Sequence, residues 1–123
     1  MGLIYKPITL SGTVGTKTFT ALMDTGASAC YIRSDEASGI APPSKIPAPV
    51  TLKLGKGDTQ VDELLVSFVE LDGHRLPWTF IIVPELTEEL IIGADFFQRW
   101  KIKLEPETES IIIDPSALKI QLV

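Results

Sequence analysis

A turn sequence interrupts a stretch of the chain that otherwise has the character of a β-strand. Residues 21–32 are ALMDTGASACYI, and Asp24-Thr25-Gly26 stands in the middle of this stretch. Asp, Thr and Gly all favour turns, so the plain interpretation is that the chain simply reverses direction here. The alternative interpretation is that Asp24 is a reactive carboxylate presented at the end of a strand. For an isolated Asp-Thr-Gly the plain interpretation is the stronger one, so the sequence around it has to decide.

Strand signals separated by turn residues dominate the rest of the chain. Runs rich in β-branched, aliphatic and aromatic residues that end at Gly, Pro, Asp or Ser are typical of strands. Such runs occupy residues 3–10, 18–23, 29–33, 50–54, 59–71, 75–84 and 90–92. Two connections predict hairpins, the one at Gly55-Lys56-Gly57-Asp58 and the one at residues 72–74, where Asp72-Gly73 suits a tight type I′ turn. A third hairpin is expected over residues 101–115 with its turn at 105–109, and residues 117–123 can add a last strand.

Short helical signals and one proline-rich segment complete the pattern. Ser34 has the character of an N-cap for one helical turn that ends at Gly39. Residues 94–100 predict a short helix with an apolar face. Residues 41–49 hold four of the nine prolines, and we interpret them as a rigid loop, because neither flank is long enough to fold well alone. The sequence therefore predicts one all-β domain, residues 1–123, with one short helix near the C-terminus.

Charge and composition exclude several classes of function. Eleven Lys and Arg residues stand against sixteen Asp and Glu residues, and the basic residues are scattered along the chain. Nucleic acids and anionic membrane surfaces both need clustered basic charge, so we expect neither partner. No apolar run approaches the length of a membrane span and the N-terminus lacks a signal-peptide pattern, which predicts a cytoplasmic protein. One cysteine and one histidine cannot build a structural zinc site, and we expect no metal or cofactor.

The context of Asp24 is more specific than the motif alone. A strand leads into Asp24-Thr25-Gly26-Ala27, a glycine-containing hairpin follows, and LIIGADFF at residues 90–97 places two bulky apolar residues before a glycine and a helix. This order resembles the retropepsins, the single-domain aspartic proteases of retroviruses, retrotransposons and several cellular and prokaryotic lineages. The resemblance spans roughly residues 4–113. It implies a closed, pseudo-symmetric β-barrel with a flap hairpin, which forms a homodimer with the active site on the two-fold axis.

Aspartic protease chemistry explains why a single motif is informative. The reaction needs two carboxylates about one hydrogen bond apart that share a proton, because both cannot ionise at that distance. One carboxylate then acts as general base on a water molecule and the other as acid toward the peptide carbonyl. Asp95 is the nearest competitor for the second role, but it opens a helix, where an acid is commonly a cap or dipole partner. A two-fold dimer instead supplies a second copy of Asp24.

The resemblance also implies roles for the neighbours of Asp24. Thr25 is expected to hydrogen-bond across the dimer beneath the two carboxylates. Gly26 lets a substrate strand approach closely, and Ala27 keeps the floor of the site small. Ser28 is expected to accept or donate hydrogen bonds to the substrate backbone or to the loop. The hairpin would fold over an extended peptide bound by strand addition, and it would exclude water. The hairpin residues expected to contact the peptide are Gly55, Lys56 and Gly57.

Two positions depart from the viral members of this family. Viral members usually carry an acid where Ser28 stands and an arginine where Ala94 stands, and those two side chains pair. Both residues are small and uncharged in this chain. Ser at position 28 is common in retrotransposon-like and cellular relatives, so the resemblance is closer to those members than to the viral ones.

Two other functions compete with proteolysis of peptides or proteins. A cysteine hydrolase would need Cys30 and His74 to meet, but Cys30 lies in a predicted core strand, where a lone cysteine usually serves as a small hydrophobe. The stronger alternative is a catalytically silent retropepsin-like module for dimerisation or peptide binding, since a fold does not determine a function. The intact Asp24-Thr25-Gly26 favours an aspartic endopeptidase. The start at Met1 and the self-contained length favour a free-standing protein.

Overall fold

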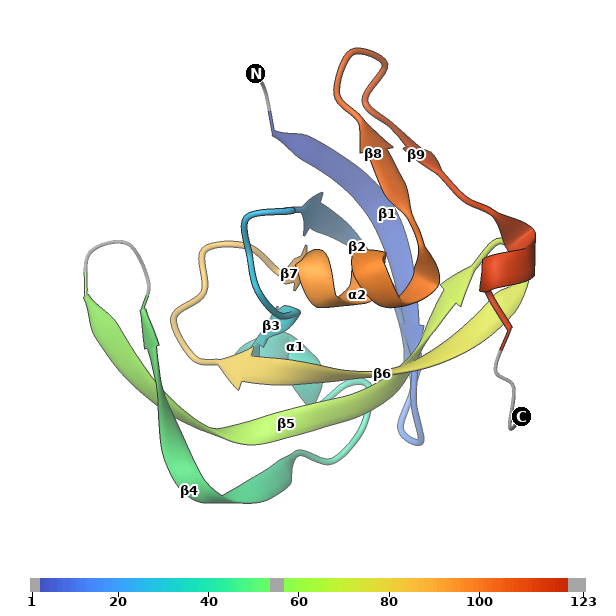
Figure 1. The fold of residues 1–123 in the computed structure, drawn as a ribbon. Helices are drawn as coiled ribbons and strands as arrows, with labels where there is room; N and C mark the ends of the chain where they lie inside the picture. Colours follow the sequence, from blue (N-terminus) through green and yellow to red (C-terminus); the bar gives the residue numbers. More distant parts are fainter. Residues whose placement is uncertain (1–2, 54–56, 120–123) are drawn as a thin grey trace.

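The first strand closes the sheet into a barrel by pairing with the long fifth strand. The structure is a computed structural model that describes residues 3–53 and 57–119 (Figure 1). Six strands follow one another around the barrel in the order β1, β2, β7, β3, β6 and β5, and β1 pairs again with β5. At this closing seam Leu10 lies opposite Val69. The fourth strand, β4, extends the sheet beyond the barrel along the free edge of β5.

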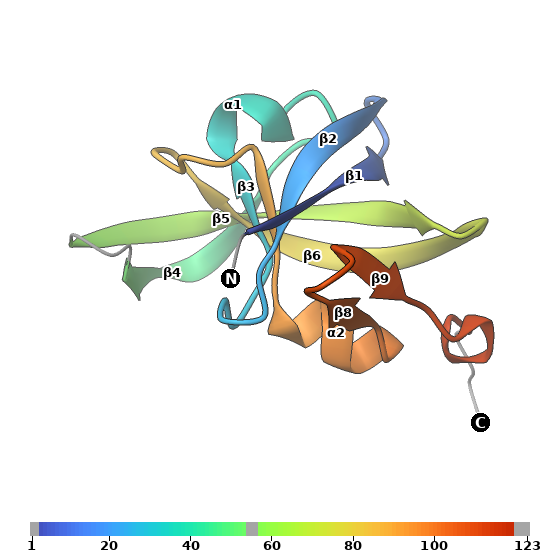
Figure 2. The same ribbon diagram turned by 90° about the horizontal axis from the view of Figure 1, so that it is seen from above.

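The strands differ greatly in length, and the longest belong to the hairpins. The strands are β1 (Ile4–Ser11), β2 (Thr16–Met23), β3 (Tyr31–Arg33), β4 (Ser44–Lys53), β5 (Asp58–Leu71), β6 (His74–Val83), β7 (Leu90–Ile92), β8 (Lys103–Glu105) and β9 (Ser110–Ile112). The helices are α1 (Ser34–Ala37), α2 (Ala94–Trp100) and a 3₁₀ turn, η1 (Pro115–Ala117). Figure 2 shows α1 on one side of the barrel, with α2 and the β8–β9 hairpin on the opposite side.

Strand β7 determines which segment lies beside the end of β2. It is inserted between β2, to which it is parallel, and β3, to which it is antiparallel. Met23 at the end of β2 lies opposite Ile92 at the end of β7. The residues that follow these two strands, Asp24 and Gly93, therefore leave the sheet side by side.

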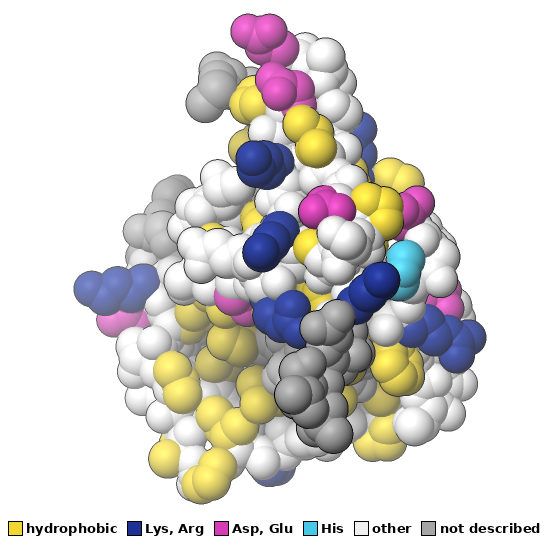
Figure 3. Space-filling model, turned by 45° about the vertical axis from the view of Figure 1, so that its right-hand side comes forward, with side chains coloured by type: hydrophobic (Ala, Val, Ile, Leu, Met, Phe, Trp, Pro, Cys, Tyr) yellow, Lys and Arg dark blue, Asp and Glu magenta, His cyan; other side chains and the backbone are white. Residues whose placement is uncertain are grey.

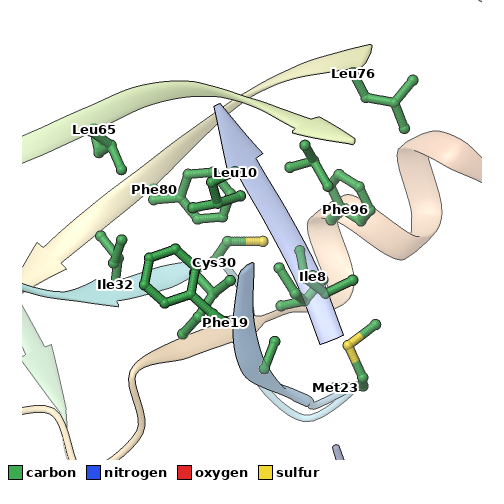
Figure 4. Packing of buried hydrophobic residues seen from close by; sticks show 14 of the residues in the cluster. Ile8, Leu10, Phe19, Met23, Cys30, Ile32, Leu65, Leu76, Phe80 and Phe96 are labelled. Carbon is green, nitrogen blue, oxygen red and sulfur yellow. The ribbon is translucent and has the colours of Figure 1, made fainter. Parts of the chain in front are cut away.

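Side chains from every wall of the barrel and from α2 fill one interior. Figure 4 shows Leu10, Phe19, Ile32 and Phe80 directed toward this common centre, and all four are almost fully buried. Helix α2 adds Phe96, whose ring meets Trp78 edge to face with 5.3 Å between the centroids. Burial of each large apolar side chain contributes about 1.5–3 kcal/mol, so this interior is the main source of stability.

A second, smaller apolar cluster joins the β4–β5 hairpin to the barrel. Its buried members are Tyr31, Val61, Val83 and Leu86. Leu52 of β4 packs against them. The hairpin is therefore packed against the barrel near its turn, where Leu52 and Val61 lie, rather than only at its base.

The prediction of an all-β closed barrel with a short helix near the C-terminus is confirmed. The Asp72-Gly73 turn has positive φ at both residues, 50° and 77°, as a type I′ turn requires. The hairpin over residues 101–115 is also present, as β8 and β9. Within the described part of the chain, no helix is long and apolar enough to cross a membrane.

Most of the proline-rich segment is part of a strand and not the predicted loop. Residues 41–49 were predicted to be a loop, but β4 begins at Ser44 and runs through Pro47 and Pro49. The pairing with β5 shifts register between Lys45 and Val50. Because β4 is the edge strand of the sheet, proline is tolerated where its missing N–H has no partner strand to serve.

Two smaller predictions are also wrong. Ser34 is the first residue of α1 rather than its N-cap, which is Arg33, and no side chain caps this helix. The described part of the segment predicted as a last strand is not extended, because η1 ends at Ala117 and Leu118 follows as a buried residue outside any strand. Residues 120–123 lie outside the described residues.

Candidate active site

Asp24 begins a tight loop as soon as β2 ends. Its N–H donates a hydrogen bond of 2.9 Å to the carbonyl oxygen of Ile92, which extends the β2–β7 ladder by one residue. The Gly26 N–H donates to Oδ1 of Asp24 at 2.8 Å, and the Ala27 N–H donates to the Asp24 carbonyl oxygen at 3.2 Å. The half-buried carboxylate is therefore held in one direction by the turn that it opens.

The far side of this loop rests on the junction between β7 and α2. The Ala94 N–H donates a short hydrogen bond, 2.7 Å, to the Ala27 carbonyl oxygen. Gly93 has an ordinary extended conformation, with φ −104° and ψ −177°, so it is not required for its backbone freedom. A Cβ at this position would instead collide with the backbone of Ala29. The loop and the junction are in backbone-to-backbone contact, which leaves the loop little room to move.

Cys30 ends the loop with its side chain in the core. Its thiol accepts a hydrogen bond from the Gly93 N–H at 3.3 Å and donates one to Oδ1 of Asp95 at 3.4 Å. The same Oδ1 accepts from the Phe96 N–H at 2.8 Å, which confirms the interpretation of Asp95 as an acid of the first helical turn. Burial is the main cause that raises the pKa of the Cys30 thiol to about 12, and it outweighs the opposite effect of the Gly93 N–H.

The competing cysteine hydrolase is excluded by these contacts. A thiol with so high a pKa stays protonated at neutral pH and is a poor nucleophile. His74, its proposed partner, lies at the Asp72-Gly73 turn, where its Nδ1 is 3.0 Å from the Asp72 carbonyl oxygen. The two side chains therefore have separate surroundings and different partners.

A cleft of about 380 Å³ opens beside the Asp24 loop. The loop contributes Asp24, Gly26, Ala27 and Ser28, so the structure brings together four of the residues predicted for the site. The opposite walls come from the barrel and from the β4–β5 hairpin. They are formed by Tyr31, Leu52, Lys53, Leu86 and Ile91.

The hairpin residues expected to contact a peptide are only partly described. Gly55 and Lys56 lie outside the described residues. Gly57 is exposed, and it is not among the residues that line the cleft. Leu52 and Lys53, which do line it, were missed by the sequence analysis. Their place four and three residues before Lys56, in the middle of the predicted flap turn, was the signal that could have identified them.

Thr25 and Ser28 are exposed in the single chain. Thr25 is the residue expected to bond across a dimer, and its exposure leaves it accessible to a second copy. Among residues 3–53 and 57–119, no group of three or more His, Cys, Asp and Glu side chains could hold a metal ion. On the face drawn in Figure 3, acidic side chains lie among the basic ones, so no single basic surface covers this face.

A larger hollow, of about 420 Å³, lies at the β1–β5 seam. It is lined by Ser11, Val66, Phe68, Arg75 and Pro77 together with Gly12, Thr13, Thr16 and Ser67. None of these described lining residues carries a carboxylate. The smaller cleft is the candidate active site, because it alone of the two contains Asp24.

Comparisons with known proteins agree with this geometry. The family model described as gag-polyprotein putative aspartyl protease matches residues 10–99, a range that contains both the Asp24 loop and the β7–α2 junction. The retroviral protease-like domain of Ddi1 from Leishmania major superposes with a TM-score of 0.70 at 19% identity, over 93% of this chain and 89% of that one. EIAV protease complexed with the inhibitor HBY-793 has a TM-score of 0.59 at 14% identity, over 85% of this chain and 93% of that one. No curated protein sequence matches the chain.

Both structural likenesses have low sequence identity, so they bear on the fold alone. The match to the family model covers more than half of the chain. The chain belongs to the gag-polyprotein putative aspartyl protease family and has a retropepsin-like fold.

Proposed function

We propose that the protein is an aspartic endopeptidase that hydrolyses peptide bonds as a homodimer, with one Asp24 from each subunit activating a water molecule. The observation that carries this proposal is the Asp24 carboxylate, which is held by the Gly26 N–H at the wall of a cleft. A turn that served only to reverse the chain would need neither a cleft nor the close backbone support from Gly93.

The need for a dimer follows from the surroundings of Asp24. Asp24 carries the only carboxylate among the lining residues of the cleft that the structure describes. Asp95 is engaged elsewhere, by the Phe96 N–H and the Cys30 thiol. Aspartic protease chemistry needs two adjacent carboxylates, so the second one has to come from another copy of the chain. A two-fold axis beside the loop would bring Asp24 against its own symmetry mate.

The reaction then follows from two carboxylates that share one proton. The ionised Asp24 takes a proton from the bound water as the water oxygen attacks the peptide carbonyl carbon. The protonated Asp24 of the other subunit donates its proton to the carbonyl oxygen, which gives a neutral tetrahedral diol. Collapse of the diol breaks the carbon–nitrogen bond. One Asp24 carboxyl gives its proton to the leaving nitrogen, while the other Asp24 carboxylate takes a proton from a diol hydroxyl, which becomes the carbonyl of the product acid. The products are a carboxylic acid and an amine, and the two residues end with one shared proton again.

The walls of the cleft favour an extended peptide with an apolar side chain. Tyr31, Leu86 and Ile91 form an apolar surface beside Asp24, and Leu52 covers it from the hairpin. Among the described residues that line the cleft, Lys53 is the only basic one. A peptide strand laid between the loop and the hairpin would bind through its main chain, and its alternate side chains would enter such pockets.

The decisive test is cleavage of a peptide library at about pH 4–6 by the wild type and by Asp24→Asn. Asparagine keeps the size of the side chain and its acceptor oxygen, but it cannot act as a base. Loss of general acid–base catalysis is expected to lower kcat/KM by about a hundred- to ten-thousandfold. Glu107→Gln, at an exposed position in the β8–β9 turn, is the matched control and should cleave like the wild type.

Two outcomes would contradict the proposal. One is equal cleavage by the wild type and Asp24→Asn. The other is no cleavage by a wild-type protein that is folded and dimeric. A dimer that binds peptides without cleaving them would instead identify a catalytically silent peptide-binding module.

A further inference from the structure

The loop that carries Asp24 is attached to the β7–α2 junction at three successive points. The Asp24 N–H bonds to the Ile92 carbonyl oxygen at the start of the loop, and the Ala94 N–H bonds to the Ala27 carbonyl oxygen in its middle. At its end, the Cys30 thiol bonds to the Gly93 N–H and to the Asp95 carboxylate. The first two attachments are hydrogen bonds between backbone atoms, and only the third is made by side chains.

Cys30 is fixed from both sides. Its carbonyl oxygen accepts a hydrogen bond from the Ile81 N–H at 2.9 Å, which joins it to β6. Its side chain is fully buried and points into the core, as Figure 4 shows. The thiol serves as acceptor and donor at once, because it stands between an N–H group and a carboxylate oxygen. An apolar side chain of the same size could fill this space but could make neither bond.

Asp95 is suited to be the other half of this attachment. Its Oδ1 receives both the Cys30 thiol and the Phe96 N–H, so one oxygen links the loop to the first turn of α2. The side chain is only half-buried, and Asp95 also lines an open hollow of about 290 Å³ with Trp78 and Thr79. This hollow lets water reach the carboxylate, which reduces the cost of keeping a charge there.

No charged pair supports the loop from positions 28 and 94, because Ser28 and Ala94 are both uncharged. We propose that Cys30 and Asp95 are positioning residues, which together set the orientation of the Asp24 loop in the active site. The inference rests on the proposed function for its effect on catalysis. The effect of the two residues on the loop itself can be measured even if the protein cleaves no peptide.

Amide hydrogen exchange tests the effect on the loop. Cys30→Ala removes both bonds of the thiol, and the Ala94 N–H, which holds Ala27, is expected to exchange at least about tenfold faster as the loop loosens. Cys30→Ser keeps a donor and an acceptor and should stay within about threefold of the wild type. Val69→Ala, which truncates a buried side chain at the distant β1–β5 seam, controls for a general loss of core packing.

Steady-state kinetics tests the effect on catalysis. Misplacement of a reacting group by a fraction of an ångström lowers rate more than binding, so Cys30→Ala should lower kcat by about ten- to a hundredfold with KM within about twofold. Asp95→Ala should do the same, whereas Asp95→Asn keeps the acceptor oxygen and should recover most of kcat. The double variant should be no slower than the slower single one, because both substitutions remove one shared attachment.

The proposal is overturned if the Ala94 N–H exchanges no faster in Cys30→Ala than in Val69→Ala. It is also overturned if kcat of Cys30→Ala equals that of the wild type, or if the two substitutions act additively. A wild-type protein without cleavage activity would contradict the proposed function, and the exchange result would still decide whether Cys30 and Asp95 hold the loop.

Discussion

Gly93 and Ala29 are in such close contact that a Cβ on Gly93 would stand 2.0 Å from the Ala29 carbonyl oxygen. It would also stand 2.8 Å from the Ala27 carbonyl oxygen. Real Cβ atoms do not approach oxygen so closely, so no other residue fits without a shift of the backbone. The apolar-apolar-glycine segment therefore ends in glycine because the Asp24 loop occupies the space where a side chain would be.

Gly93→Ala should be among the most damaging small substitutions in this chain. The collision involves backbone atoms on both sides, and such overpacking is expected to lower the free energy of unfolding by about 3 kcal/mol or more. Thermal and urea unfolding measure this change. Gly39→Ala is the control, because its Cβ would meet its nearest neighbour, the Glu36 carbonyl oxygen, at an ordinary 3.6 Å. We expect Gly39→Ala to change stability by less than about 1 kcal/mol, and equal effects of the two substitutions would contradict this account of Gly93.

Thr25→Ala should weaken the proposed homodimer without unfolding the subunit. The Thr25 side chain is exposed in the single chain, so its removal costs the monomer little. If the hydroxyl bonds across the two-fold axis, symmetry removes two hydrogen bonds of about 1 kcal/mol each, which raises the dimer dissociation constant by about thirtyfold. Sedimentation equilibrium measures this constant. Thr25→Ser keeps the hydroxyl and should dimerise like the wild type, whereas an unchanged constant for Thr25→Ala would argue against a role in the dimer.

The Cys30 thiol should react very slowly in the folded protein. Its pKa is raised from 9.0 to about 12, chiefly by burial, so at pH 8 the folded state holds about a thousandfold less thiolate than the unfolded chain. Alkylation with iodoacetamide, followed by mass spectrometry, should therefore be slow in buffer and fast in denaturant. Rapid alkylation of the folded protein at pH 8 would contradict the burial of this group.

The same shift predicts a pH dependence of stability with a definite sign. A folded-state pKa above the unfolded value means that the folded state keeps its proton longer. The contribution is fully present below about pH 9 and is lost as pH rises toward about 12. Cys30→Ser carries no group that titrates there, so its free energy of unfolding should fall less steeply between pH 9 and 12. Parallel curves for the two proteins would contradict the assignment.

Lys53 should influence which peptides are cleaved. It is an exposed basic residue at the wall of the cleft, so an acidic substrate residue near it should gain about 1 kcal/mol, or about fivefold in kcat/KM. Lys53→Glu should reverse this preference, and the difference should shrink at high salt. Lys103→Glu, an exposed residue of β8 outside the cleft, is the charge-matched control. Paired peptides with Glu or Lys at one position measure the effect, and an unchanged preference in Lys53→Glu would exclude this role.

Features that depend on a few neighbouring residues could be predicted from the sequence. The Asp72-Gly73 turn is an example, because its two positive φ angles follow from the local preferences of Asp and Gly. The loop at Asp24-Thr25-Gly26 is another, since the Gly26 N–H reaches a carboxylate only two residues away. In both cases the interactions that decide the conformation lie within the turn itself.

Features that depend on which strands become neighbours could not be predicted in this way. The prolines of residues 41–49 indicated a loop, yet Pro47 and Pro49 lie in β4, because an edge strand has a side on which no N–H is needed. The contact between Cys30 and Asp95 joins residues 65 positions apart, and the sequence around neither residue predicts it. Leu52 and Lys53 reach the cleft only because the hairpin leans over the barrel from the β4–β5 side.

The sequence by itself determined the type of most elements and the presence of a single Asp-Thr-Gly loop, because local backbone preferences and the alternation of apolar residues are enough for that. The tertiary structure alone decided what this loop can do. It inserts β7 between β2 and β3, brings Gly93 against Ala29 and Cys30 against Asp95, and so gives Asp24 a rigid support and a cleft. Those contacts form only when the barrel closes, since each joins residues that lie far apart in the sequence and that local preferences cannot bring together.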